Sequence, residues 1–251
     1  MITSKERAAL RAQANPLEDT LIVGKSGISQ TLLDEAVILL DSHELVKGRV
    51  LETAGLTARE ASDMLCEALG AEGIVCVGTK FVIWRKSEKL AQEKKKADEK
   101  YKKGLAAYIR KTNPNVKKSK SLKMAGYFIA KGKKYNLDPK VLMAIAKNES
   151  TFYTNAKSPY GYKGLMQTSD ALARKYGYKP SSLYKAEVSI EVGARYLRAM
   201  KNKFKTYTKA LSAYAYGEGT VMSGNYSKSI AKKLLRTRKD ITKYLERNNY
   251  I

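Results

Sequence analysis

The stretch AKNESTFYTNAKSPYGYKGLMQ, residues 146–167, contains a single acidic side chain, Glu149. Leu142, Ile145 and Glu149 follow one another at spacings of three and four residues, so the carboxyl group lies on the core-facing stripe of a predicted helix. Removal from water favours the neutral form of a carboxyl group and raises its pKa. A general acid that works near neutral pH needs such a raised pKa, so a Glu149 side chain on this stripe would be suited to donate a proton.

The alternative is a helix-end glutamate that points to solvent or pairs with a lysine, and the spacing alone does not separate the two. The surrounding residues favour the acid. Asp138 and Pro139 give the helix a strong start signal. Gly161 and Gly164 allow a tight loop to fold back over the helix end, and the amide of Gln167 can donate to and accept from sugar hydroxyl and N-acetyl groups.

Two later segments are predicted to form helices that could pack near Glu149. EVSIEVGARYLRAM predicts a helix whose central Gly193 permits close packing against a neighbour, and KALSAYAYGEG predicts a helix that ends in a small-residue turn and presents Tyr214 and Tyr216. After Glu149 the next acid is Asp170, which begins the predicted helix TSDALARKYG and is expected to cap it rather than to catalyse.

The ordered motifs E-S, G-L-M-Q, G-A-R-Y-L and A-Y-x-x-G-x-G, over about residues 122–225, resemble the soluble lytic transglycosylase (SLT, goose-lysozyme-like) family of peptidoglycan-cleaving enzymes. The resemblance implies a mostly α, lysozyme-like fold with a glycan groove and Glu149 as its one catalytic residue. The expected substrate-binding residues are Ser150, Gly164, Leu165, Met166, Gln167, Tyr214 and Tyr216. One departure is Ala215, which stands where the family has asparagine and would weaken substrate binding or shift Tyr214.

The same resemblance implies a mechanism with one carboxylate. Glu149 would protonate the glycosidic oxygen between N-acetylmuramic acid and N-acetylglucosamine, then accept the proton of the muramyl C6 hydroxyl as a 1,6-anhydro ring closes. Most glycosidases use a second carboxylate. A goose-type hydrolase, which uses water instead of the C6 hydroxyl, is an alternative. The tyrosines expected either to stack on sugar rings or to occupy core and surface positions are Tyr153, Tyr160, Tyr162, Tyr176 and Tyr178.

The first 87 residues alternate helix and strand patterns, which is typical of an α/β unit with a small four-stranded sheet and packed helices. Ser29 and Thr57 are predicted N-caps, Glu60 completes a capping box with Thr57, and Gly70 ends that helix. Helices are predicted at 4–13, 29–44 and 56–70, and strands at 20–23, 45–52, 73–78 and 80–85.

The feature with chemistry in this unit is GKSG, residues 24–27, between the first strand and the second helix. Two glycines at a helix start bring backbone N–H groups close to an anionic ligand, with help from Lys25. A plain tight turn explains the two glycines equally well.

VGKSGIS, HELVKGRVLE, AREASDMLCEALGAE and VGTKFVIWRKS together resemble the small bacterial YhbY-type (CRM-domain) RNA-binding proteins, which are associated with precursors of the large ribosomal subunit. The resemblance implies RNA, ribosomal in that family, as a partner, and a fold like the C-terminal domain of translation initiation factor three. The residues expected to contact RNA are Gly24, Lys25, Ser26 and Gly27, with Lys5, Arg7, Arg11, Lys47 and Arg49 as electrostatic candidates.

Charge divides the 251-residue chain sharply. The total is +24, but residues 1–90 hold 11 Lys and Arg against 13 Asp and Glu, so they carry about −2 and the remainder +26. All 17 tyrosines follow residue 100. The expected organisation is a CRM-like RNA-binding domain at 1–87, a Lys-rich charged helical linker at 88–120 and an SLT-type transglycosylase domain at 121–251. A solvated linker is favoured over a nucleic-acid contact.

Other classes are excluded by composition. Cys66 and Cys76 sit in apolar patterns without a CxxC pair, and His43 is the single histidine, so the sequence predicts no metal site, no disulfide scaffold and no cofactor. No apolar signal region and no stretch of 18 apolar residues occurs, so neither a signal peptide nor a membrane span is predicted. Synthesis in the cytoplasm is expected, with the cell wall or a phage particle as the destination of the enzymatic part.

The combined prediction is a peptidoglycan lytic transglycosylase with an N-terminal RNA-binding module. The alternative is an RNA-binding protein whose basic SLT-like domain is inactive or only binds glycan, and Ala215 favours it. The charge of +26 suits a polyanionic cell wall and nucleic acid equally. The closing segment SIAKKLLRTRKDITKYLERNNYI predicts an amphipathic helix pair.

Overall fold

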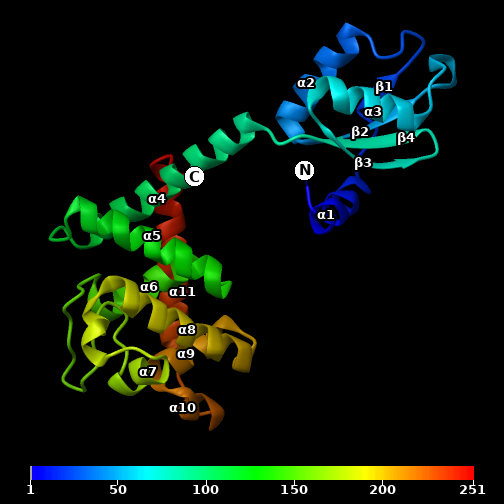
Figure 1. Ribbon diagram of the computed structural model, residues 1–251. Helices are drawn as coiled ribbons and strands as arrows, with labels where there is room; N and C mark the ends of the chain where they lie inside the picture. Colours follow the sequence, from blue (N-terminus) through cyan, green and yellow to red (C-terminus); the bar gives the residue numbers. More distant parts are fainter. Residues whose placement is uncertain (1) are drawn as a thin grey trace. The chain divides into compact units, whose positions relative to one another are not determined.

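A computed structural model describes residues 2–251, and the chain divides into two compact units (Figure 1). Unit 1 is Met1–Lys96 and unit 2 is Ala97–Ile251. Unit 1 contains α1 (Ser4–Ala14), β1 (Leu21–Val23), α2 (Gln30–His43), β2 (Leu45–Val50), the 3-10 helix η1 (Glu52–Ala54), α3 (Ala58–Leu69), β3 (Glu72–Val77) and β4 (Lys80–Trp84). This order confirms the α/β fold predicted for the N-terminal part.

The four strands of unit 1 form one mixed sheet in the order β1-β2-β4-β3. β1 runs parallel to β2, whereas β4 is antiparallel to both β2 and β3, with a bulge between Gly73 and Val75. Apolar residues of α2 and α3, such as Leu40 and Leu65, pack on one face of the sheet. The ring of Phe81 covers the strand partner Gly48, where a Cβ atom would lie only 2.3 Å from the ring, so the glycine makes room for the core.

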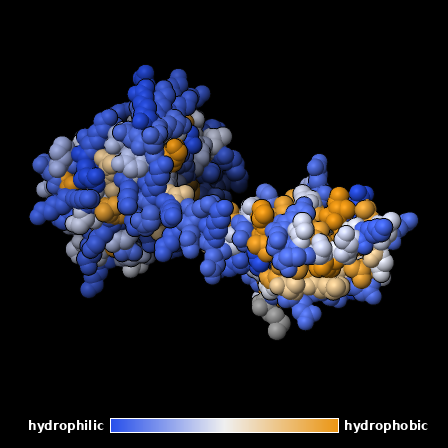
Figure 2. All heavy atoms as spheres, turned by 90° about the horizontal axis from the view of Figure 1, so that it is seen from above, coloured by the Kyte–Doolittle hydropathy of each residue, from blue (hydrophilic) through white to orange (hydrophobic). Residues whose placement is uncertain are grey.

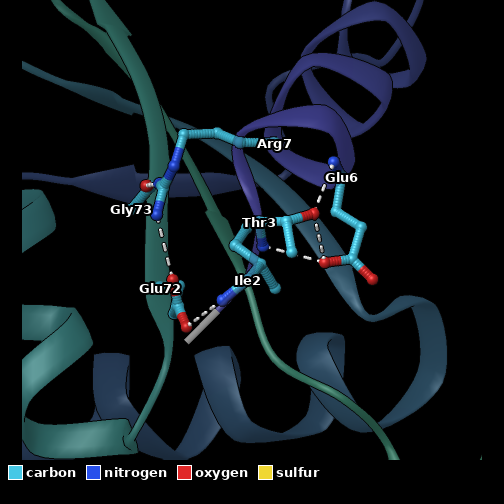
Figure 3. Close-up of polar contacts among 6 residues, drawn as sticks. All are labelled: Ile2, Thr3, Glu6, Arg7, Glu72 and Gly73. Atoms are coloured by element: carbon cyan, nitrogen blue, oxygen red, sulfur yellow. Dashed lines mark hydrogen bonds and ion pairs between the residues drawn. The ribbon is translucent and has the colours of Figure 1, made fainter.

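Helix α1 covers part of the opposite face and is fastened at its start (Figure 3). The Thr3 hydroxyl accepts from Glu6 N, and the Glu6 carboxylate accepts from Thr3 N at 2.8 Å, which is a capping box. The backbone N–H of Ile2 donates to Glu72 at 2.9 Å, and Arg7 pairs with Glu72 at 3.0 Å and donates to the Gly73 carbonyl. The guanidinium of Arg7, an electrostatic candidate for RNA contact, is therefore engaged within the fold.

The local signals read from the sequence are found where they were predicted. The Ser29 hydroxyl accepts from Leu32 N at the start of α2, and Thr57 and Glu60 form the capping box of α3. Gly70 adopts the left-handed conformation that ends α3. These caps depend only on neighbours in the chain, which is why the sequence alone could place them.

Unit 2 is mostly helical, as predicted. After α4 (Glu88–Thr112) it contains α5 (Lys118–Tyr135), α6 (Pro139–Ser150), α7 (Asp170–Lys175), the 3-10 helix η2 (Pro180–Tyr184), α8 (Ala186–Phe204), α9 (Tyr207–Tyr216), α10 (Glu218–Met222) and α11 (Ser229–Arg247). Every residue from Val141 to Ala146 is buried, so α6 is the central helix, and α5, α8 and α11 pack around it.

Three sequence expectations differ from the structure. The segment predicted as a solvated linker ends inside unit 2, because Leu105 and Ile109 of α4 are fully buried in its core. The closing segment is the single helix α11 rather than a pair. Ser169, not Asp170, caps α7, and Asp170 instead pairs with Lys163 at 2.8 Å. The predicted domain limits remain a prediction, whereas the structural division lies between residues 96 and 97.

A buried carboxylate joins α8 to α5. Glu191 is 4% exposed and forms ion pairs with Lys131 at 2.9 Å and Lys134 at 2.8 Å, and it also accepts a hydrogen bond from the Tyr135 hydroxyl. Burial alone would raise the pKa of Glu191, but the hydrogen bonds from Lys134, Tyr135 and Lys131 outweigh it and lower the pKa to about 2. The ionised form of Glu191 therefore stabilises the folded state.

We predict that Glu191→Gln lowers the stability of unit 2 by about 2–4 kcal/mol at neutral pH, because it leaves a poorly exposed ammonium without its partner. The folded pKa lies below the ordinary value of 4.5, so the difference from wild type should be full above about 4.5 and disappear as the pH falls toward about 2. Thermal melts across this range measure it.

Glu187→Gln is the matched control, since Glu187 lies one turn away, is 55% exposed and reaches Lys131 only at 3.8 Å. It should change stability by less than about 1 kcal/mol. Equal melting temperatures for the two variants would contradict a stabilising role for the buried cluster.

Candidate active site

Helix α6 carries Glu149 to the edge of the core. The Asp138 carboxylate accepts from Lys140 N at the start of α6, as predicted, and also pairs with Arg238 of α11 at 2.8 Å. Glu149 follows the buried part of the helix and is itself half-buried. Burial raises the pKa of Glu149, although a hydrogen bond from Asn148 and the nearby charge of Lys233 oppose the shift. The net raised pKa is the direction that a proton donor requires.

The loop after α6 is held down by three hydroxyl groups from three helices. Ser150 of α6 donates to the Leu165 carbonyl at 2.8 Å, and Tyr214 of α9 donates to the Met166 carbonyl at 2.9 Å. Ser189 of α8 accepts from Met166 N at 2.9 Å. Buried backbone groups must be paired, and here side chains from outside the loop provide the partners. We call Ser150, Ser189 and Tyr214 the hydroxyl clamp.

Two glycines allow the loop to come this close. Gly164 has φ +74°, and a Cβ atom there would lie 1.9 Å from the Leu183 carbonyl oxygen. Gly193 of α8 lies against the loop, where a Cβ atom would be 2.8 Å from the Met166 side chain and 2.9 Å from the Tyr214 hydroxyl. The close packing expected at Gly193 is therefore present, and its neighbours are the loop and α9.

A cavity of about 620 Å³ opens beside Glu149. Its residues come from the end of α6, the loop, α7, α8 and the end of α9. They are Glu149, Ser158, Tyr160, Tyr162, Gln167, Thr168, Ser169, Ala171, Leu172, Lys175, Tyr196, Tyr214, Ala215, Tyr216 and Gly217. Within the described residues, Glu149 is the single acid in this lining and Lys175 the single cation, and five tyrosines accompany them.

Charge and aromatic surface in the cavity are arranged around the acid. Burial raises the pKa of Tyr214 well above its usual value, and the charge of Glu149 adds to the shift, so this hydroxyl stays protonated and keeps donating to the Met166 carbonyl. Tyr160 is 89% exposed, and Tyr162 and Tyr216 are also exposed. Exposed aromatic faces beside a proton donor can stack on the apolar faces of sugar rings.

In unit 1, the GKSG segment forms a turn that leads into α2. Gly27 N donates to the Gly24 carbonyl at 2.9 Å, and Gly27 has φ +59°. The side chains of Lys25 and Ser26 between them are exposed. The turn thus offers one free ammonium and one free hydroxyl at the helix start. Within residues 2–251 no group of His, Cys, Asp and Glu gathers that could hold a metal ion.

Comparison with known families matches both parts of the chain. Residues 2–85 match the model of the CRS1/YhbY (CRM) domain, and residues 126–235 match the model of the transglycosylase SLT domain. Two successive parts of the chain thus match two different domain families, and we call these parts the CRM domain and the SLT domain. Both resemblances seen in the sequence are thereby confirmed, and the cavity lies in the SLT domain.

Curated relatives divide in the same way. The CRM domain is 24% identical to "Probable RNA-binding protein YqeI" of Bacillus subtilis (strain 168), over 37% of this chain and 96% of that protein. The SLT domain is 30% identical to "Membrane-bound lytic murein transglycosylase E" of Buchnera aphidicola subsp. Baizongia pistaciae, and 30% identical to "Transglycosylase" of Enterobacteria phage PRD1. These two matches cover 43% and 41% of this chain, and 59% and 38% of the two transglycosylases.

The SLT domain brings only part of the predicted site into the cavity. Glu149, Gln167, Tyr214 and Tyr216 line it. The Gln167 amide nitrogen donates to the Ala156 and Gly164 carbonyls at 3.2 and 2.8 Å, so only its carbonyl oxygen is left for a ligand. Among the residues expected to bind substrate, those that hold the loop instead of lining the cavity are Ser150, Gly164, Leu165 and Met166.

The tyrosines divide similarly. Tyr160 and Tyr162 line the cavity, as expected for sugar-stacking residues, whereas Tyr176 lies under Arg195 at 4.2 Å and Tyr178 packs in a small core cluster. Tyr153 is exposed outside the lining. The remaining lining residues had no role in the sequence prediction. Two of them, Tyr196 and Gly217, belong to the motifs G-A-R-Y-L and A-Y-x-x-G-x-G, whereas no local pattern marks the others, which are Ser158, Thr168, Ser169, Ala171, Leu172 and Lys175. Only the packing of separate elements brings these residues into the lining with Glu149.

The hydroxyl clamp can be tested with Tyr214→Phe, which leaves the buried Met166 carbonyl without its hydrogen-bond donor. We expect the stability of unit 2 to fall by about 1–3 kcal/mol. Tyr196→Phe is the control, because Tyr196 also lines the cavity but donates at 3.3 Å to the Ala213 carbonyl, which already accepts from Gly217 N. Chemical denaturation of both variants measures the difference, and equal losses would rule out the clamp.

Proposed function

We propose that unit 2 is a peptidoglycan lytic transglycosylase that cleaves the β-1,4 bond between N-acetylmuramic acid and N-acetylglucosamine. The match to the SLT domain and the two transglycosylases among its relatives support this activity. The observation that carries the proposal is a half-buried carboxyl group with a raised pKa, in a cavity whose described lining contains no second acid. A site with one carboxylate suits chemistry in which the substrate supplies its own nucleophile.

In the proposed reaction Glu149 acts first as acid and then as base. Its proton goes to the glycosidic oxygen as the bond to the muramyl C1 breaks, and an oxocarbenium-like centre develops. The ionised Glu149 then takes the proton of the C6 hydroxyl while that oxygen bonds to C1 and closes the 1,6-anhydro ring. Burial assists the first step by favouring the protonated acid, and it makes the carboxylate a stronger base in the second step.

The remaining side chains of the lining have binding roles in this proposal. Tyr160, Tyr162 and Tyr216 offer aromatic surface to the sugar rings, and the free carbonyl oxygen of Gln167 accepts from a hydroxyl or an N-acetyl N–H group. Ala215 lines the cavity without a polar group, so the contact that the family asparagine would make is lost here. Tyr214 acts by positioning the loop rather than by touching the reacting atoms.

Digestion of purified peptidoglycan followed by mass spectrometry tests the reaction. Wild type should release anhydro-muropeptides, and Glu149→Gln should lower their rate of release by about 10²–10⁴ because the proton donor is removed. Reducing-end products would instead identify a hydrolase that uses water. No release by wild type would support the alternative, an RNA-binding protein with an inactive or glycan-binding SLT domain.

Asp170→Asn is the matched control for this experiment. It makes the same carboxyl-to-amide change at the next acid in the chain, which is partly exposed, pairs with Lys163 and does not line the cavity. Its rate should stay within about threefold of wild type, since a partly exposed ion pair contributes little.

We further propose that the CRM domain binds RNA through the GKSG turn, with Gly24 and Gly27 close to the RNA backbone and Lys25 and Ser26 in contact with phosphate or ribose. The family match and the exposed side chains of the turn support this assignment. Among the electrostatic candidates, Lys47 donates to the Leu17 carbonyl and Arg7 pairs with Glu72, so both are partly engaged within the fold.

Gly27→Asp should raise the dissociation constant for RNA about tenfold, because it places a negative charge where a phosphate is expected. Gly55→Asp is the control: like Gly27, Gly55 has a positive φ, +65°, in a turn of the same unit, and no atom lies within 4 Å of its added Cβ. Fluorescence anisotropy with a single-stranded RNA compares the two. Equal affinities would mean that GKSG is only a turn.

A further inference from the structure

Helix α11 carries a row of cations along its outer face. Its inner residues Ala231, Leu234, Ile241 and Leu245 are buried against the rest of unit 2. On the opposite side five exposed cations, here called the α11 stripe, are Lys232, Arg236, Lys239, Lys243 and Arg247, and the exposed acids Asp240 and Glu246 lie at the two edges of this row. At about 100° per residue these five lie within an arc of about 80°, and they extend over about 22 Å of helix. The five cations therefore form one continuous row along the helix axis.

The cations of the α11 stripe form no close ion pair within the described part of the fold. In the part of the chain that the structure describes, none of its five cations lies within 4 Å of a carboxylate, and the ion pair of α11 is made by Arg238 on another side. Like charges four residues apart, such as Lys239 and Lys243, repel each other and weaken a helix. The visible face of unit 2 in Figure 2 is mostly hydrophilic, with scattered apolar spots. An anionic ligand outside the fold would relieve this repulsion.

The first turn of α11 lies near the acid. Helix α11 packs on α6 and α9, and the ion pair between Arg238 and Asp138 fixes it to the start of α6. Near the other end of α6, Lys233 is close enough to Glu149 to act on its charge. The stripe lies on the side of α11 that faces away from α6, but its first residue, Lys232, is next to Lys233 in the chain, so a polymer along the stripe begins near the end of α6 that holds Glu149.

The distribution of aromatic residues indicates which anion fits. Single-stranded nucleic acids are bound by cations together with aromatic platforms on which bases stack. Carboxylates need only charged donors. Among the described residues the exposed tyrosines, Tyr153, Tyr160, Tyr162 and Tyr216, belong to the loop and to α9, and none lies on α11. The stripe thus offers charge without stacking, whereas the cavity of the same unit offers stacking.

We propose that the α11 stripe binds the carboxylates of acidic peptides attached to the glycan strand whose sugars enter the cavity. The polymer would be held along α11 by its peptides while a glycosidic bond reaches Glu149. This inference rests on the proposed function and deepens it, since it makes peptide-bearing strands the preferred substrate.

Binding to insoluble peptidoglycan, measured by co-sedimentation of the full chain, tests the proposal. All proteins carry Glu149→Gln so that nothing is cleaved. The combined substitutions Lys232→Gln, Arg236→Gln, Lys239→Gln and Lys243→Gln should raise the dissociation constant about tenfold or more at low salt, and the difference should shrink at about 1 M salt. The control, with the same loss of four charges, replaces four exposed lysines around the start of α5 by Gln: Lys117, Lys118, Lys120 and Lys123. It should bind within about twofold of the parent.

Strands freed of their peptides by an amidase complete the test. The stripe variant and its parent should bind these bare strands equally. An equal loss in the stripe and control variants would overturn the proposal in favour of general charge attraction, and so would a stripe-dependent loss on bare strands. Weaker binding of single-stranded RNA with unchanged binding of peptidoglycan would assign the stripe to nucleic acid instead.

The proposed catalysis is judged separately, by the products that wild type releases. Stripe-dependent binding without anhydro products would leave the inference standing and remove the proposed activity. Anhydro products without stripe dependence would do the opposite.

Discussion

The candidate site depends on pairing the buried backbone of one loop. Leu165 and Met166 are fully buried, so their peptide groups have no water to bond, and hydroxyl groups from α6, α8 and α9 take its place. Because these hydroxyls come from three helices, the loop, the end of α6 and the end of α9 are held in one arrangement. The cavity beside Glu149 is the space that this arrangement leaves.

The same constraint explains the residue types in the motifs. Gly164 and Gly193 are needed because the backbone of Leu183 and the side chain of Met166 occupy the space of a Cβ atom. Tyr214 is long enough to reach across from α9 and donate to the loop. Most of the motif residues therefore hold the loop in place instead of contacting a ligand. They position Glu149 and the tyrosines that line the cavity. The same packing takes the Glu149 carboxyl group partly out of water, and this burial raises its pKa.

The two proposals assign different physics to the two units. The CRM domain is close to neutral and offers a short turn, so the proposed RNA contact relies on a few backbone and side-chain donors at the start of α2. The SLT domain carries a large positive charge, part of it gathered on one face of α11. None of the helices over residues 2–251 has the length and apolar content to cross a lipid bilayer.

The sequence by itself determined the features that depend on near neighbours: the caps at Ser29, Thr57 and Asp138, the order of elements, and the position of Glu149 at the inner side of a helix end. Only the tertiary structure decided which motif residues face the cavity. Leu165 and Met166 lie next to Gln167 in the chain, yet packing from α8 and α9 buries them while Gln167 reaches the lining. Likewise no local pattern marks Lys175, which lines the cavity together with Glu149 because α7 packs there. Capping and periodicity are set within a few residues of chain, whereas a cavity is set by how separate helices exclude water together.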